Sequence, residues 1–293
     1  MRSVKYDFWA HALNKLVYVL PDEWYLFLRF KNRVGYWPHL RHPRSFNEKL
    51  QWLKLHDKHA EYTQMVDKVE AKKYVASILG EEYIIPTLGV WNSVDEIEWD
   101  KLPNQFVIKV TSDSGGVIVC KDKSKLDMEK AKEKLSDGWG KNYYVFNKEY
   151  PYRDLKPRII AEEYKEDESG YELKDYKFFC FNGTVQLFKI DYDRTTAHHA
   201  NYYSRDGEKL PFGEAAFKPT NKNITLPSNL GKMIELAENL AKDKIFVRVD
   251  FYDVNNKIYF GEITFFPASG MGKFTDEKWD FKLGEMIELP KNK

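Results

Sequence analysis

The chain has 293 residues, of which 43% are hydrophobic, and this length can form one large domain or two smaller domains around a substantial core. Its formal net charge of +1 argues against a general electrostatic attraction to nucleic acid, so no nucleic-acid partner is expected. Aromatic residues make up 16% of the chain, and their rings suit a carbohydrate or nucleotide ligand as well as a core.

The N-terminal segment lacks the features of an export signal or a membrane anchor. It has no long apolar stretch and no small-residue cleavage site. No run approaches the roughly 20 apolar residues that a membrane span needs, so we expect a cytoplasmic protein. Residues 8–41 mix aromatic and basic residues, most densely over 21–41. This pattern allows contact with the inner face of the membrane or with an assembly complex, although such a helix more often packs on its own protein.

Residues 8–79 are expected to be mostly helical. Ser45 precedes the run FNEKLQWLKLHD and has Glu48 three residues on, which is the pattern of a helix N-cap with a capping box. A further helix is predicted over residues 61–79, and Gly80 is its predicted C-cap.

The middle of the chain changes to apolar, β-branched runs. The predicted strands are residues 83–91, 106–110, 116–120 and 158–165. An exposed amphipathic helix is predicted over residues 127–148. The polar run 166–170 is predicted to be a loop and the boundary between two halves of the chain. Cys120 and Cys180 lie in apolar strand-like runs and are expected to be buried free thiols.

The C-terminal half continues with hairpins. Residues 174–192 are predicted to turn back at Asn182-Gly183. A helix is predicted within residues 224–242, with Ser228 as its N-cap. A final hairpin follows this helix.

The final hairpin carries the most informative pattern in the sequence. It is predicted to turn at Asn255-Asn256. Asp250 lies on its first strand, and Glu262 and Thr264 alternate on its second strand. Folding the hairpin back brings these two carboxylates and the hydroxyl together at one end. Such an all-oxygen set suits Mg²⁺, which usually takes phosphate oxygens as well. The alternative is a solvated face of the hairpin.

A second pattern joins a lysine to a Ser/Gly loop. Lys109 lies on a predicted strand, and the loop after it contains Ser112, Ser114, Gly115 and Gly116. Glycines let backbone N–H groups approach phosphate closely, and hydroxyls add donors. The segment is neither a Walker motif nor a Rossmann fingerprint. The alternative is an ordinary hairpin turn with a surface lysine.

Two weaker patterns involve charged residues on strands. Glu162 and Glu163 follow an apolar strand at a chain crossover, where backbone groups can hold a purine and a carboxylate can accept ribose hydroxyls. The alternative is an exposed strand end. Asp175 and Lys177 are two residues apart and so share one face of a strand, where Lys177 could neutralise a terminal phosphate. The alternative is a surface ion pair of little energetic value.

The order of these patterns resembles the ATP-grasp superfamily, and specifically the teichuronopeptide-biosynthesis (TupA-like) ATP-grasp family of bacterial surface-polysaccharide clusters. The resemblance covers about residues 20–290. Its most specific runs are FNEKLQWLKL and GEITFFP. The other matching runs are DKVEAKKYV, YIIPTLGVW, LPNQFVIKVTSDSGG, KPRIIAEEY, DYKFFCFNG and VRVDFY.

The resemblance implies an α+β ATP-grasp fold in which two α+β subdomains clasp ATP. Residues 1–80 would form a helical N-terminal region, 81–165 a lid subdomain whose Ser/Gly loop covers the phosphates, and 166–293 a catalytic subdomain that supplies the metal ligands. The implied cofactors are ATP and Mg²⁺.

The resemblance also implies roles for single residues. The residues matched to nucleotide contacts are Lys68, Lys109, the Ser/Gly loop, Glu162, Glu163 and Tyr164, together with Asp175 beside Lys177. Lys177 matches a phosphate-contacting lysine, and Arg248 matches an arginine that stabilises the transferring phosphate. Asp250 and Glu262 match Mg²⁺ ligands. Many ATP-grasp ligases have Asn two residues after this Glu, where Thr264 stands here and offers a weaker ligand.

The implied reaction is ATP- and Mg²⁺-dependent joining of a carboxylate to an amine through an acyl phosphate, in surface-polysaccharide biosynthesis of the capsular or teichuronic type. The substrate would be a small molecule or a polysaccharide precursor. The alternatives are a glycosyltransferase acting on a nucleotide sugar, an ATP-grasp sugar kinase and a non-enzymatic scaffold. A basic and aromatic cluster is expected either to line the acceptor site or to form a solvated loop, and it comprises Arg194, His198, His199, Asn201, Tyr202 and Arg205.

Overall fold

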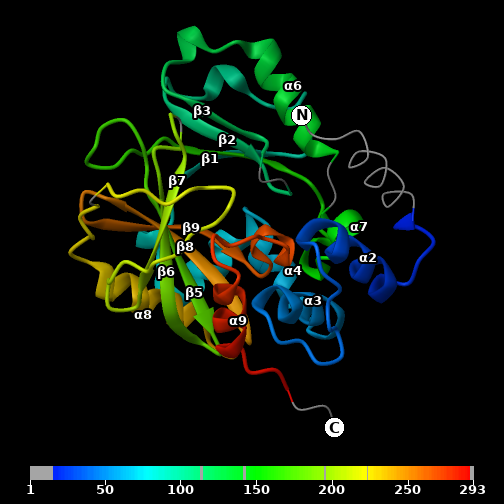
Figure 1. The fold of residues 1–293 in the computed structure, drawn as a ribbon. Coiled ribbons are helices and arrows are strands. Elements are labelled where there is room, and N and C mark those ends of the chain that lie inside the picture. Colours follow the sequence, from blue (N-terminus) through cyan, green and yellow to red (C-terminus); the bar gives the residue numbers. More distant parts are fainter. Residues whose placement is uncertain (1–15, 113–114, 141–142, 195, 223, 291–293) are drawn as a thin grey trace.

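The computed structural model describes residues 16–290 apart from 113–114, 141–142, 195 and 223. Two antiparallel sheets and the helices around them form the fold (Figure 1). Residues 8–15 of the predicted helical region and Ser114 of the predicted loop lie outside the described residues. Among the described residues, no helix has both the length and the apolar character that crossing a membrane requires.

The N-terminal region is helical, as predicted. Its helices are α2 (Asp22–Val34), α3 (Phe46–His56), α4 (Glu61–Val66) and α5 (Glu70–Leu79). Ser45 caps α3, and the capping box with Glu48 is confirmed. Gly80 ends α5, and its N–H donates to the carbonyl of Ala76, which confirms the predicted C-cap.

The prediction of one continuous helix over residues 61–79 is wrong. The chain breaks between α4 and α5, where the Asp67 carboxylate accepts hydrogen bonds from the N–H groups of Val69 (2.8 Å) and Glu70 (3.1 Å). A local side-chain cap therefore replaces the backbone bonds that would have continued α4. The break places Lys68 in the turn between the two helices.

The smaller sheet contains β1 (Thr87–Trp91), β2 (Phe106–Val110), β3 (Val117–Cys120) and β4 (Ile159–Glu163), in the order β1-β4-β2-β3. The strand predicted over 83–91 begins only at Thr87, after a 3₁₀ turn. Alternate residues of β2 are buried, and they pack with Leu135 of α6 (Met128–Trp139). The segment predicted as one helix over 127–148 contains both α6 and α7 (Tyr143–Asn147).

The larger sheet contains β5 (Asp175–Phe181), β6 (Thr184–Tyr192), β7 (His199–Ser204), β8 (Phe246–Val254) and β9 (Lys257–Thr264), in the order β7-β6-β5-β8-β9. Both predicted hairpin turns are confirmed. Asn182, Gly183, Asn255 and Asn256 all have positive φ angles, between 49° and 82°, as tight hairpin turns of this kind require. Strand β7 was not predicted.

The two faces of the larger sheet have different neighbours. Cys180 of β5 faces α8 (Leu230–Ala241), since its Sγ lies 3.9 Å from the carbonyl oxygen of Ala237. The opposite face carries Phe181, whose ring contacts that of Phe46 at the start of α3. Helices α8 and α3 therefore lie on opposite sides of the sheet (Figure 1). Cys120 and Cys180 are both buried free cysteines, as predicted.

Two smaller points complete the fold. Ser228 is not the N-cap of α8, because α8 begins one residue later than predicted and has Asn229 at the cap. The Ser228 hydroxyl instead lies 3.0 Å from Asn256 Oδ1.

The change from the smaller sheet to the larger sheet falls between Glu163 and Asp175, around the predicted loop at 166–170. The division into subdomains stays a prediction.

Helix α9 (Lys278–Glu285) packs closely on the start of α3, so a larger residue at the contact should lower the stability of the fold. A Cβ at Gly284 would lie 2.2 Å from the backbone carbonyl oxygen of Arg44. We expect Gly284→Ala to destabilise the fold by about 3 kcal/mol, since backbone atoms must move apart. Gly231→Ala in α8 is the matched control. Its Cβ meets nothing within 4 Å, so it should stabilise by about 0.5–1 kcal/mol. Thermal unfolding of both variants measures the difference, and equal stabilities would contradict this close approach.

Candidate active site

Three neighbouring strands bring a charged cluster together on the larger sheet. Lys177 of β5 pairs in register with Asp250 of β8, and Asp250 pairs with Glu262 of β9. Arg248 of β8 pairs with Thr264 of β9. Because side chains two residues apart share a face of a strand, these five side chains lie beside one another. The structure therefore brings together Asp250, Glu262 and Thr264 at one end of the hairpin.

Arg248 is the centre of this cluster. Its Nε lies 2.7 Å from Asp250 Oδ1, and its Nη2 lies 2.7 Å from Asp250 Oδ2 and 2.6 Å from Glu262 Oε1. The same Nη2 lies 3.1 Å from the Thr264 hydroxyl. Lys177 Nζ lies 2.6 Å from Asp250 Oδ2 and also donates to Asp175. Two carboxylates and a hydroxyl therefore converge on one guanidinium.

The burial of this cluster decides its charge state. The Asp250 side chain has no exposed surface, and burial raises its pKa to about 6 against the opposing effects of Arg248 and Lys177. The Glu262 side chain is 42% exposed, and although partial desolvation acts to raise its pKa, Arg248, Lys177 and Lys68 lower it below the usual range. Both carboxylates are therefore ionised at neutral pH.

These donors fit a magnesium ion that arrives with a phosphate group. Among the described residues, no group of three or more His, Cys, Asp or Glu could hold a metal by itself. Mg²⁺ sites in nucleotide enzymes often need only one or two carboxylates, with phosphate and water completing the coordination. Asp250 and Glu262 provide two carboxylates, which a metal would share with Arg248. A site formed by protein ligands alone does not fit.

A second cluster lies on the smaller sheet. Lys109 Nζ of β2 lies 2.5 Å from Glu162 Oε2 of β4, and Lys72 Nζ of α5 lies 2.6 Å from Glu162 Oε1. Although burial acts to raise the pKa of Glu162, Lys109 and Lys72 lower it. Glu162 thus balances two lysines in this structure. Lys72 was not identified from the sequence.

Glu163 and Tyr164, which were also matched to nucleotide contacts, have other neighbours. Glu163 forms an ion pair with Lys165 (2.8 Å), and the Tyr164 hydroxyl donates to Glu166 (2.8 Å). Lys165 also lies over the ring of Tyr259 on β9, 5.4 Å from its centroid. Residues 163–165 therefore touch the larger sheet where the chain passes from one sheet to the other.

The Ser/Gly loop closes the β2–β3 hairpin. Val110 N–H donates to the carbonyl of Gly116 (3.0 Å), and Val117 N–H donates to that of Gly115 (2.9 Å). The buried Ser112 hydroxyl has no hydrogen-bond partner among the described residues. Lys68 links the helical region to this loop, since its Nζ lies 3.2 Å from the carbonyl oxygen of Thr111, next to Ser112.

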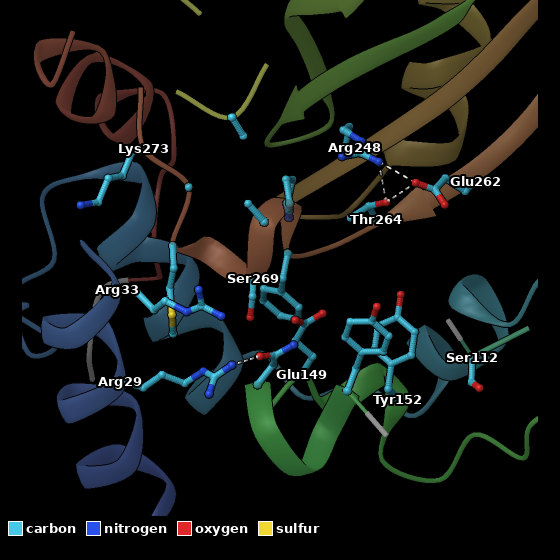
Figure 2. Close-up of a pocket in the computed structure, with 18 of the residues that line it drawn as sticks. Arg29, Arg33, Ser112, Glu149, Tyr152, Arg248, Glu262, Thr264, Ser269 and Lys273 are labelled. Atoms are coloured by element: carbon cyan, nitrogen blue, oxygen red, sulfur yellow. Dashed lines mark hydrogen bonds and ion pairs between the residues drawn. The ribbon is translucent and has the colours of Figure 1, made fainter. Parts of the chain in front are cut away.

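A cavity of about 850 Å³ adjoins the Arg248 cluster (Figure 2). Arg248, Glu262 and Thr264 lie on one side of it, while Arg29, Arg33 and Lys273 lie on the other. Its remaining wall combines Lys68 and Ser112 with parts of residues 143–152 and 266–272. The lining residues that were not predicted from the sequence include Arg29, Arg33, Glu149, Tyr152, Ser269 and Lys273. The four-residue spacing of Arg29 and Arg33, which puts both on one helix face, was a usable signal for two of them.

The predicted acceptor cluster over residues 194–205 is not brought together. Arg194 reaches Asp175 at 3.4 Å, and His198 lies 3.7 Å from Asp191, so both approach the charged cluster. Asn201 and Tyr202 are buried in β7. Arg205 binds Glu238 of α8, near the opposite end of the sheet. Neither an acceptor site formed by all six residues nor a solvated loop describes this segment, because β7 alternates its side chains between two faces.

The segment after β9 has an unusual backbone that α3 holds in place. Ala268, Ser269 and Gly270 have positive φ angles of 48°, 57° and 59°. Gln51 Nε2 donates to the carbonyls of Ser269 (3.1 Å) and Gly270 (2.6 Å), and Lys54 Nζ donates to that of Ser269 (2.8 Å). Left-handed backbone at residues other than glycine costs on the order of 1–3 kcal/mol each and needs such support. The runs FNEKLQWLKL and GEITFFPASG therefore pack on each other beside the cavity.

The chain matches a known protein family over most of its length. The family model described as TupA-like ATPgrasp matches residues 48–288. None of the curated proteins searched matches the chain.

Solved structures with similar folds include several ligases. The D-alanine–D-alanine ligase of Bacillus anthracis has a TM-score of 0.39 and 15% identity, over 68% of this chain and 56% of that chain. The corresponding ligase of Helicobacter pylori has a TM-score of 0.39 and 18% identity, over 83% and 69%. The phosphoribosylamine–glycine ligase of Thermotoga maritima has a TM-score of 0.41 and 14% identity, over 69% and 48%. The chain spans about half to two thirds of the length of these structures.

Proposed function

Because the chain belongs to the TupA-like ATP-grasp family, we propose that it is an ATP- and Mg²⁺-dependent ligase that joins a carboxylate to an amine. The observation that carries this proposal is the convergence of Lys177, Arg248, Asp250 and Glu262 from three adjacent strands, beside a cavity that Lys68 and Ser112 also line. Such a convergence of cations and carboxylates supports binding of a triphosphate with its metal.

The donor sets divide between metal and phosphate. Asp250, Glu262 and Thr264 would hold Mg²⁺, while Lys68, Lys109 and Lys177 would neutralise phosphate oxygens. With MgATP bound, the substrate carboxylate would accept the γ-phosphoryl group and ADP would be released. The amine would then attack the carbonyl carbon of the acyl phosphate, which would give an amide and release phosphate. Glu162 already balances Lys109 and Lys72, so phosphate binding would draw these lysines into a larger charge network.

Arg248 would stabilise the negative charge of the transferring group. Its guanidinium is held at both Nε and Nη2 by Asp250, so little reorganisation is needed when charge develops nearby. Lys177 is fixed in the same way between Asp175 and Asp250. Catalysis in this proposal rests on positioning and charge neutralisation rather than on a protein nucleophile.

The metal assignment is tested by calorimetric titration of ATP with Mg²⁺. We expect Glu262→Ala to weaken binding by at least tenfold, since it removes a charged oxygen ligand of the bound metal. Glu235→Ala, at an exposed pair with Lys232 on α8, is the matched control and should bind as wild type does. Equal affinities for wild type and Glu262→Ala would remove the metal assignment.

Product analysis separates the ligase from the other reactions. A ligase releases ADP and phosphate only when both substrates are present. A kinase leaves phosphate on the acceptor, and a glycosyltransferase consumes a sugar nucleotide without ATP.

The resemblance to polysaccharide-cluster enzymes leads us to include surface-polysaccharide biosynthesis in the proposal. We also include a cytoplasmic location, where ATP is available.

A further inference from the structure

Three positive charges gather at the side of the cavity away from Arg248. Arg29 and Arg33 lie one turn apart on α2, and Lys273 follows the left-handed segment after β9 (Figure 2). Within the part of the chain that the structure describes, none of the three forms an ion pair with a carboxylate. The cations of the proposed phosphate site differ in this respect, because Lys109, Lys177 and Arg248 are each paired with an acid.

Arg29 carries the clearest sign of a missing partner. Its Nη1 donates to the Tyr25 hydroxyl (3.0 Å) and its Nη2 donates to Asn147 Oδ1 (2.8 Å), which are both neutral acceptors. Its Nε is buried and has no hydrogen-bond partner among the described residues. A buried donor without a partner costs about 1–3 kcal/mol and calls for an explanation. A guanidinium fixed by two neutral groups is ready to receive an oxyanion.

The charge around this end of the cavity stays positive after its acids are counted. Among the described residues that line the cavity, Glu149 and Glu262 are the two carboxylates. Glu149 lies close enough to feel Arg29 and Lys54, which both act to lower its pKa against the larger effect of burial. At this end of the cavity, one lining carboxylate therefore stands against three lining cations, Arg29, Arg33 and Lys273. An anionic ligand group would correct this imbalance.

We propose that Arg29, Arg33 and Lys273 bind a second oxyanion, a carboxylate or a phosphate, of the substrate whose reacting group lies at Arg248. The substrate class is then an acidic compound with two separated negative groups, one of which does not react. This inference rests on the proposed function only for the choice of the reacting end. It also gives the N-terminal helix α2 a part in substrate selection.

The test compares ligands that differ by one anionic group, using calorimetry on the full chain with ADP and Mg²⁺ and again without them. The first pair is L-glutamate and 4-aminobutyrate, and the second is glucuronic acid 1-phosphate and glucuronic acid. We expect at least one doubly charged ligand to bind about tenfold more tightly than its partner, since hydrogen bonds to charged groups contribute about 1.5–3 kcal/mol. The pair that shows the preference identifies the second oxyanion as a carboxylate or a phosphate.

Variants assign that preference to the three cations. Arg29→Gln should reduce this preference about tenfold. Arg33→Gln and Lys273→Gln should do the same, and since both side chains are exposed, neither substitution should affect folding. Arg41→Gln removes an exposed arginine outside the cavity and should leave the preference unchanged. If neither doubly charged ligand is preferred, or if the preference survives in the Arg29→Gln/Arg33→Gln double variant, the inference is overturned. Failure of wild type to bind ATP, with the preference intact, would instead count against the proposed function alone.

Discussion

Arg248→Met should lower ADP release about 10³-fold and destabilise the fold by about 3–5 kcal/mol, because it leaves a buried carboxylate without its main partner. Asp250 has no exposed surface, and Arg248 contacts both of its oxygens at 2.7 Å. Lys177 would remain as its one cationic partner and is itself shared with Asp175. The positive charge that we propose to stabilise the transferring group also balances Asp250, so both effects would be lost together.

The two effects can be separated by a second substitution. In Arg248→Met/Asp250→Asn the buried negative charge is also gone, so most of the stability should return while ADP release stays low. Thermal unfolding and a coupled assay for ADP measure the two quantities. Arg153→Met, at an exposed pair with Asp154, is the matched control and should change neither by much. An Arg248→Met protein with wild-type stability would show that Asp250 is not the buried charge described above.

The central part of the site was predictable because it depends on local geometry. Asn255 and Asn256 adopt the left-handed backbone that a two-residue hairpin needs, and this turn fixes which residues of the two strands lie opposite each other. With the register fixed, the period of two in a strand puts Asp250 and Glu262 side by side. No long-range information was required, so the sequence alone could place these residues together.

The cavity was not predictable in this way because its walls come from distant segments. Arg29 reaches Asn147 across 118 residues of sequence, and Lys54 reaches Ser269 across 215. Neither contact leaves a periodic pattern that could be recognised. The break at Asp67 has the opposite cause, since a purely local side-chain cap overrode an apolar spacing that indicated one helix.

The run FNEKLQWLKL was recognised as specific, but its physical role became visible only in the structure. Asn47, Gln51 and Lys54 lie on one face of α3, and all three donate to carbonyls of residues 269–272. Gly270 has to be small here, because a Cβ would lie 2.5 Å from Gln51 Nε2 and 2.7 Å from Leu50 Cβ. We infer that these polar residues of a buried helix are present to shape a loop rather than to fill a core.

Lys54→Met should therefore disturb the cavity without touching the phosphate site. The buried Lys54 ammonium donates to the carbonyl and the hydroxyl of Ser269, both at 2.8 Å, and to Gln51 Oε1 at 3.2 Å. It also offsets the charge of the buried Glu149. We expect a loss of about 2–4 kcal/mol in stability from the unpaired groups left behind. The KM for the acidic substrate should rise at least tenfold, while the affinity for ATP with Mg²⁺ stays within about twofold.

A double-variant cycle divides this effect between charge and loop shape. Glu149→Gln in the Lys54→Met background removes the uncompensated carboxylate, so stability should recover in part. Ser269 would still lack the hydrogen bonds from Lys54, so the KM should stay high. Lys58→Met changes an exposed lysine just beyond the same helix and serves as the control. Since Lys54 donates to the loop and to its own helix, a weakened affinity for ATP in Lys54→Met would contradict the separate roles assigned to these two sides of the cavity.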